Sequence, residues 1–194
     1  MSDFGKLMAP LRRSLGNMIA RGVVTAVNSA TKMQTLQIRL MADESKSDVE
    51  HFEPYGYTSN PKPGAEEVAL FPDGDRSHGL VIVVADRRYR LQGLLSGEMA
   101  IHDDQGQKVH LTRTGIVIDG ANKPLVIQNV PTATVKASTK VRMETPLLEV
   151  TGDIKDKCDS TGKTMSGMRT TYNTHTHNEN NAAGGPTNQP NQQM

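Results

Sequence analysis

The feature that most constrains the fold is a long stretch without aromatic residues. No Phe, Tyr or Trp lies between Arg90 and Thr171, and the whole 194-residue chain is only 4% aromatic. Aromatic side chains supply much of the buried area in an ordinary protein core. This part of the chain must therefore bury its apolar surface with small and β-branched side chains.

Short segments of the same stretch alternate between apolar and polar residues, which is typical of half-buried β-strands. A single ribbon of such strands has an uncovered apolar face and is not stable alone. Copies intertwined around a common axis would cover that face, and a narrow axis would exclude aromatic rings. We predict an intertwined β-helical shaft over residues 96–165, with a conventional β-sandwich as the alternative. The apolar pairs are Met99 and Ile101, Val109 and Leu111, Ile116 and Ile118, Leu125 and Ile127, Val135 and Ala137, Val141 and Met143, and Leu148 and Val150.

The N-terminal half predicts a small β domain over residues 21–95, so the fold class expected for the chain is all-β. Strands are expected at 22–27, 36–40, 67–71 and 79–84, from β-branched runs and period-two alternation. Residues 41–53 are polar and acidic and predict a loop. About five strands in this length are typical of a small barrel of the oligonucleotide/oligosaccharide-binding (OB) type.

Residues 1–20 predict an N-terminal arm with a short amphipathic helix. The apolar residues at helical spacing are Leu7, Leu11, Leu15 and Met18, although Pro10 and Gly16 weaken the pattern. The arm lacks the apolar run of a signal peptide, and the chain has no run of about 18 apolar residues. We therefore expect synthesis in a cytoplasm. The single cysteine, Cys158, excludes an intramolecular disulfide.

One motif, His175-Thr176-His177, carries clear chemistry. In an extended strand both imidazoles would lie on one face, about 7 Å apart along the chain. One chain supplies only two nitrogen ligands, whereas a structural zinc site needs about four. If three chains meet at a tip, their six imidazoles form an octahedral set, which suits iron, nickel or cobalt better than zinc. We predict a metal-binding apex over residues 166–180, with His175 and His177 as its ligands.

Two further features lie near this motif. Asp153, Asp156 and Asp159 recur every three residues; they form either a solvated face or, repeated by threefold symmetry, a carboxylate ring that holds Ca²⁺. Residues 181–194 are rich in Asn, Gln, Gly and Pro and predict a flexible polar tail.

Two other functions compete with a structural role. A metal-dependent hydrolase or oxygenase would use the His pair with a third ligand, for which Glu179 is the candidate, and with an open coordination position. A nucleic-acid-binding barrel would use Tyr55, Tyr57 and Tyr89 for stacking. Acidic residues between Asp43 and Glu53 oppose phosphate, and the net charge of only +1 does not favour a nucleic-acid partner.

Several segments resemble the phage baseplate assembly protein V family. They are residues 54–64 (PYGYTSNPKPG), 69–71 (ALF) and 74–79 (GDRSHG), followed by the aromatic-free stretch and the His-Thr-His motif. The resemblance covers nearly the whole chain. Its strongest single mark is the histidine pair at the end of the shaft.

The resemblance implies a homotrimeric spike of a contractile phage tail. It implies a barrel that docks on the baseplate hub, a triple-stranded β-helix as the shaft, and a tip that pierces the host outer membrane. It also implies one iron ion per trimer, bound by His175 and His177 of each chain, and no enzymatic activity. The protein would then be made in the host cytoplasm and reside in the virion.

Overall fold

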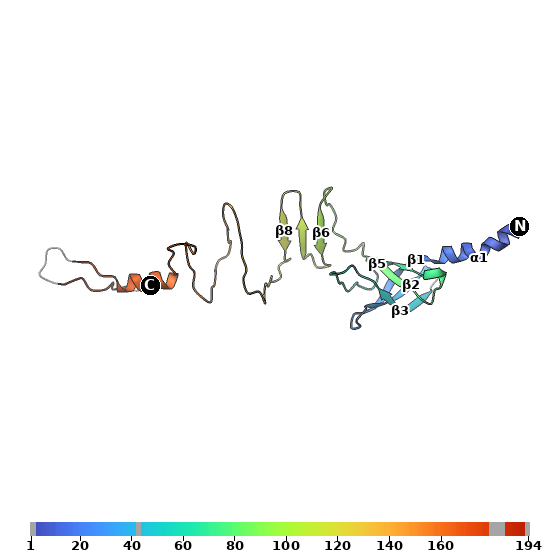
Figure 1. The fold of residues 1–194 in the computed structure, drawn as a ribbon, viewed down its shortest axis with the longest axis horizontal. Helices are drawn as coiled ribbons and strands as arrows, with labels where there is room; N and C mark the ends of the chain where they lie inside the picture. Colours follow the sequence, from blue (N-terminus) through green and yellow to red (C-terminus); the bar gives the residue numbers. More distant parts are fainter. Residues whose placement is uncertain (1–2, 42–43, 179–184, 193–194) are drawn as a thin grey trace. The chain divides into compact units, whose positions relative to one another are not determined.

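The computed structural model describes residues 3–41, 44–178 and 185–192, and the chain divides into two compact units, Met1–Gln128 and Asn129–Met194. The first unit begins with helix α1, Asp3–Asn17, which contains Pro10 (Figure 1). Helix α1 confirms the helix predicted in the arm. Ser14 Oγ of this helix donates a hydrogen bond to the carbonyl oxygen of Asp73, at 2.7 Å.

Five strands follow α1 and close into a barrel. They lie in the order β1-β2-β3-β5-β4, and β1 pairs with β4 to complete the ring. Neighbouring strands are antiparallel except β3 and β5, which are parallel. A short 3₁₀ helix, η2, lies between β4 and β5. The bounds are β1 Ile19–Asn28, β2 Thr35–Leu40, β3 Ser45–His51, β4 Glu66–Leu70, η2 Pro72–Gly74 and β5 Leu80–Ala85.

The barrel encloses a small aliphatic core with one aromatic ring. Strand β2 alternates buried and exposed residues, as its sequence predicted. One charged residue, Glu67, lies among the most deeply buried side chains at 1% exposure. The buried apolar residues are Val24, Leu36, Ile38, Leu40, Val49, Ala65, Ala69, Phe71 and Val81.

The prediction of a loop over residues 41–53 was wrong, because strand β3 occupies most of this segment. Its polar residues lie mainly on the outside of the barrel, while Val49 and His51 are buried. A strand needs only one apolar face, so two inward side chains are enough to bury this strand in the barrel. The charged composition therefore reflects the solvent-facing side of a strand.

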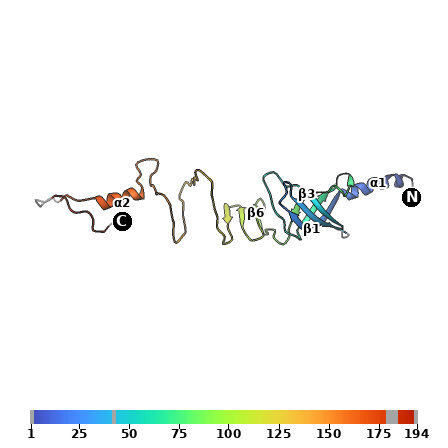
Figure 2. The ribbon, with the colours of Figure 1, turned by 90° about the horizontal axis from the view of Figure 1, so that it is seen from below.

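Three more strands form a separate antiparallel sheet, β6-β7-β8, within the first unit (Figure 2). The strands are β6 Met99–His102, β7 Lys108–Leu111 and β8 Ile116–Asp119, at the positions that the alternating pattern predicted. Their register places Met99, Leu111 and Ile116 in one row across the sheet. Ile101, Val109 and Ile118 form a second row on the same face.

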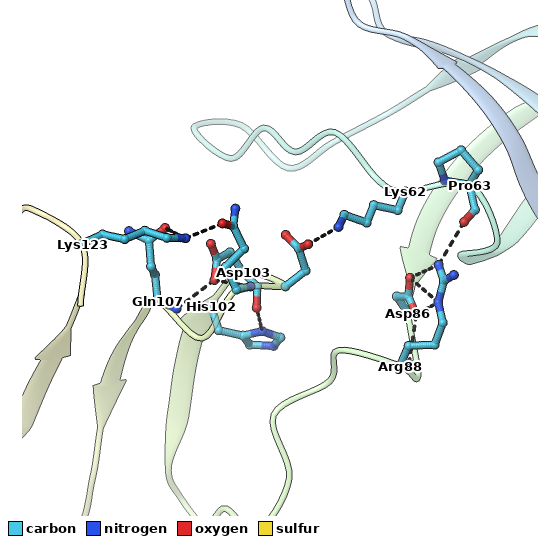
Figure 3. A network of polar contacts seen from close by, with 10 residues as sticks. Lys62, Pro63, Asp86, Arg88, His102, Asp103, Gln107 and Lys123 are labelled. Carbon is cyan, nitrogen blue, oxygen red and sulfur yellow. Dashed lines mark hydrogen bonds and ion pairs between the residues drawn. The ribbon is translucent and has the colours of Figure 1, made fainter. Parts of the chain in front are cut away.

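Polar contacts connect the barrel to the turn between β6 and β7 (Figure 3). Lys62, in the loop before β4, forms an ion pair with Asp104 in this turn. The Arg88 guanidinium contacts the Asp86 carboxylate and donates a hydrogen bond to the Pro63 carbonyl oxygen at 3.0 Å. The side-chain bond from Lys62 and the nearby positive charge lower the pKa of Asp104.

Beyond β8 the chain has little internal structure of its own. Every residue from Asn122 to Thr161 is exposed, and none belongs to a strand apart from one bridge between Lys155 and Thr164. In the second unit the chain then forms helix α2, Met165–Thr174 (Figure 1). No helix was predicted in the apex segment.

Candidate metal centre

Helix α2 is held at its start by two polar side chains. Thr164 is the N-cap residue, and its Oγ1 accepts a hydrogen bond from the Gly167 amide at 3.0 Å. The Asp153 carboxylate accepts hydrogen bonds from the Ser166 hydroxyl and from the Ser166 amide. These hydrogen bonds, the hydroxyl first, lower the pKa of Asp153 to about 2. The first turn is thus tied to the chain that precedes it.

His175 lies at the C-terminal end of α2 and is held by the helix. Its amide donates to the Thr171 carbonyl oxygen at 3.1 Å, and its ring Nδ1 lies 2.6 Å from the Tyr172 carbonyl oxygen. A carbonyl oxygen can only accept, so the proton of this hydrogen bond is on Nδ1. In the neutral ring Nε2 is then left with its lone pair, which is the state a metal ligand requires.

The His177 ring lies close to that of His175. The two ring centres are 5.1 Å apart and the ring planes are nearly perpendicular, and the centre of the Tyr172 ring lies 5.4 Å from that of His175. His175 is half-buried and His177 is exposed. Both imidazoles are therefore available to a shared ion.

The separation of the rings fits two imidazoles on one ion. With metal–nitrogen bonds of about 2.1 Å, and each ring centre roughly 1 Å behind its nitrogen, neighbouring ligands have ring centres about 4.5–5.5 Å apart. The described residues contain no group of three or more His, Cys, Asp or Glu that could hold a metal. Within that part, one chain offers the pair, and further ligands would have to come from other copies.

The backbone around the pair differs from the predicted strand. His175 has extended dihedral angles, φ −70° and ψ 146°, but it directly follows a helix and neither histidine belongs to a strand. The helical turn brings the Tyr172 carbonyl oxygen within hydrogen-bond distance of His175 Nδ1, a contact that a strand would not provide. Glu179, the candidate third ligand of an enzyme, lies outside the described residues.

The three aspartates that recur before α2 each serve a different local contact. Asp153 holds Ser166, Asp156 accepts a hydrogen bond from the Lys163 amide at 2.8 Å, and Asp159 lies 3.8 Å from Cys158 Sγ. They do not gather into a cation site within the described part of one chain. A calcium ring built from several copies stays a prediction.

Two residues near the pair were missed by sequence reasoning. Thr187 donates its amide to the His177 carbonyl oxygen at 2.9 Å and accepts the His177 amide on Oγ1 at 2.8 Å. Tyr172 supplies the carbonyl that orients His175. The helix that presents Tyr172 had a signal, since Thr164 precedes apolar residues at helical spacing, Met165, Met168 and Tyr172. No local pattern marks Thr187.

The barrel carries a groove of about 520 Å³ between the β1–β2 turn and the loop after β3. At its base the buried His51 Nδ1 contacts Gln34 Oε1 at 2.9 Å, and Gln34 Nε2 donates to the Ser59 carbonyl oxygen. Burial lowers the pKa of His51, and Glu53 opposes this effect only partly. Tyr55 and Tyr57 line the groove and are exposed.

The third tyrosine proposed for base stacking is engaged within the protein. The Tyr89 ring lies 5.2 Å from Lys62 Nζ and 5.3 Å from the Arg88 guanidinium. It therefore contributes to the contacts between the barrel and the β6–β7 turn. Neither described helix is long and apolar enough to cross a bilayer.

Comparison with known proteins identifies the family. Residues 21–88, which span the barrel except for the first two residues of β1, match the family model described as Bacteriophage Mu Gp45, N-terminal. The chain is 34% identical over 154 residues to the baseplate puncturing device gp45 of Escherichia phage Mu, covering 79% of this chain and 74% of the relative. It is 32% identical over 180 residues to the Mu-like prophage FluMu protein gp45 of Haemophilus influenzae, covering 92% and 96%. The chain therefore belongs to the phage Mu gp45 family of baseplate proteins.

Proposed function

We propose that this chain is the central spike of a contractile phage-tail baseplate, a structural protein that pierces the host outer membrane when the sheath contracts. The name of its phage Mu relative, a baseplate puncturing device, supports both the location in the tail baseplate and the role. The proposal includes a homotrimer, contacts with baseplate hub proteins, and no catalytic activity.

The observation that carries the proposal is the uncovered apolar face of the sheet β6-β7-β8. Its two rows, Met99–Leu111–Ile116 and Ile101–Val109–Ile118, consist entirely of large apolar residues. All six side chains are exposed, from 37% for Val109 to 70% for Ile116. A soluble chain does not leave such a face in water, so the face needs a partner.

The segment after β8, residues 122–161, also requires a partner. Residues 122–161 are exposed and almost free of strand pairing, although apolar residues such as Leu125, Ile127 and Val135 recur along them. Once the apolar side chains are covered, the backbone amides and carbonyls beside them leave water and require hydrogen-bond partners in the protein. Two further copies of the same chain, wound around one axis, would supply both the pairing and the apolar cover.

The five-stranded barrel closes between β1 and β4, with β3 and β5 parallel, and this arrangement supports an OB-type barrel as part of the proposal. We assign it to docking on the hub, since the aromatic ring of Tyr89 is already engaged by cations and acidic side chains line β3. These two observations support hub docking over nucleic-acid binding as the proposed role of the barrel.

Three copies would bring His175 and His177 together as six imidazoles around one iron ion. Such a set leaves no open position for substrate, so the metal would tie the three chain ends together. Fixing the ends at the apex opposes fraying where a chain is least constrained. This role does not require a pocket or a catalytic base.

The test is light scattering after size exclusion, with elemental analysis of the same peak. Wild type is expected to be a trimer with one iron per three chains. The His175→Ala/His177→Ala double variant is expected to remain a trimer and to lose the iron. A wild-type monomer, or one metal per chain, would overturn the spike proposal and favour a metal-dependent enzyme.

A further inference from the structure

The two histidines of the candidate metal centre are held in different ways. The amide of His175 is bonded to Thr171 and its ring to the Tyr172 carbonyl, so helix α2 fixes both its backbone and its side chain. His177 lies beyond the end of the helix and cannot use it in this way. The geometry of the pair therefore depends on what fixes the position of His177.

Thr187 supplies what the helix does not. Its amide donates to the His177 carbonyl oxygen at 2.9 Å, and its hydroxyl accepts the His177 amide at 2.8 Å. Both polar groups of the His177 backbone are thereby bonded to one residue, ten positions further along the chain. We call these two hydrogen bonds the clasp. Thr187 itself is half-buried, whereas its neighbours Pro186 and Asn188 are exposed.

We propose that Thr187 is a positioning residue for the metal ligands, which it serves by fixing the backbone of His177 through the clasp. This inference rests on the proposed role of His175 and His177 in holding a metal. Fixing φ and ψ of His177 fixes the direction of its Cα–Cβ bond. The ring then stays near His175 before a metal arrives, and less conformational entropy is lost on binding.

Through the clasp, the polar tail contacts the backbone of a candidate metal ligand. The sequence beyond the histidines predicts a flexible tail, but Thr187 returns to His177 after ten residues. In Figure 1 the red segment that contains Thr187 runs back toward α2. The part of the tail around Thr187 is then a component of the apex, and its removal would loosen one of the two ligands.

The experiment compares full-length wild type with three variants. Thr187→Val keeps the shape of the side chain and the amide but removes the hydroxyl, and Thr187→Ser keeps both groups. Thr170→Val is the matched control, because the Thr170 hydroxyl bonds the Ser166 carbonyl within α2 and does not contact either histidine. Iron(II) affinity is measured by competition with a chelator. Hydrogen exchange of the His177 amide is measured on metal-free protein.

Thr187→Val is expected to bind iron(II) about 10–100-fold more weakly, the range typical of groups that orient metal ligands. It is also expected to lose protection at the His177 amide, while Thr187→Ser and Thr170→Val match wild type in both measurements. Unchanged iron affinity in Thr187→Val would overturn the positioning role, and unchanged exchange would overturn the clasp. If wild type binds no iron while Thr187→Val still loses protection, the metal proposal fails and the clasp stands.

Discussion

Gly22 on β1 lies directly opposite Glu67 on β4, and the Glu67 carboxylate fills the space that a side chain at position 22 would need. A Cβ at this position would also come within 2.7 Å of the Arg39 carbonyl oxygen. Gly22 is therefore required for close packing, since its absent side chain is what leaves room for a buried acid.

This packing predicts the effect of Gly22→Ala. The added methyl group must displace Glu67 or the β2 backbone, so the free energy of unfolding should fall by about 1–3 kcal/mol. Urea denaturation followed by circular dichroism measures the change. Gly16→Ala is the control, because a Cβ at Gly16 meets no atom within 4 Å, and it should be neutral or slightly stabilising. Equal stability of the two variants would contradict the close approach at Gly22.

The buried Glu67 predicts a dependence of stability on pH. Burial raises the pKa of Glu67 from 4.5 to about 7, and neither carboxylate oxygen has a hydrogen-bond partner among the described residues. The folded barrel thus holds this proton more tightly than the unfolded chain. Below pH 4.5 Glu67 is protonated in both states and does not change the free energy of unfolding. As pH rises from 4.5 to about 7, the unfolded chain ionises more readily than the folded barrel, and the free energy of unfolding falls by about 3 kcal/mol.

Urea denaturation at pH 5 and pH 8 tests this prediction. Wild type should be less stable at pH 8, and Glu67→Gln should remove most of the difference because an amide does not ionise. Glu66→Gln is the neighbouring control: the Glu66 carboxylate is bonded to Arg21 and Arg87, which lower its pKa. A wild-type barrel equally stable at both pH values would show that Glu67 is not buried as described.

The apolar face of β6-β7-β8 predicts opposite outcomes for two adjacent residues. Ile118 lies in the second apolar row, whereas Val117 lies on the other face beside His110. Ile118→Asp would place three carboxylates near the proposed axis, at several kcal/mol per chain, and should abolish the trimer. Val117→Asp should leave the trimer intact by light scattering. A trimer in both variants would show that this face is not the one buried between copies.

The contact between Asp153 and Ser166 predicts that the start of α2 depends on a carboxylate. Asp153→Ala should speed hydrogen exchange in the first turn of α2, because the Ser166 amide and hydroxyl lose their acceptor. The lowered pKa of Asp153 also predicts a pH dependence. The stability that Asp153 gives to the first turn of α2 is complete above pH 3.8 and is lost as pH falls toward 2. Asp159→Ala should leave the exchange of α2 unchanged.

Regular alternation made the strands of the chain predictable. Period-two alternation placed β2 and the three strands after the barrel near their observed positions, and β-branched or apolar runs placed β1, β4 and β5. The same alternation at Leu125 and Ile127, and at Val135 and Ala137, belongs to no strand within this chain. Strand β3 was missed because only Val49 and His51 face inward, which is too short a pattern to outweigh its charged residues. The burial of Glu67 was also not predictable, because composition alone does not indicate that an acidic residue lies in a core.

The sequence indicates the two candidate metal ligands but not the contacts that surround them. The spacing of His175 and His177 is visible in the sequence, but the hydrogen bond to the Tyr172 carbonyl depends on the path of the backbone. Thr187 depends on the chain returning after ten residues, and such a return leaves no periodic trace. Local sequence patterns indicate contacts between residues close in sequence but not contacts between residues that are distant in sequence.

If the proposed trimer forms, the exposed segment from Asn122 to Thr161 divides folding into two stages, one within a single chain and one that needs several chains. The barrel closes within one chain and can finish soon after synthesis. In the proposed trimer the exposed segment would fold only on encounter with two other copies, so its folding rate would depend on the concentration of chains in the cell. Until then, its exposed apolar side chains and unpaired backbone can associate with the wrong partner. The number of chains made, and the time at which they are made, would then affect how much of the protein folds correctly.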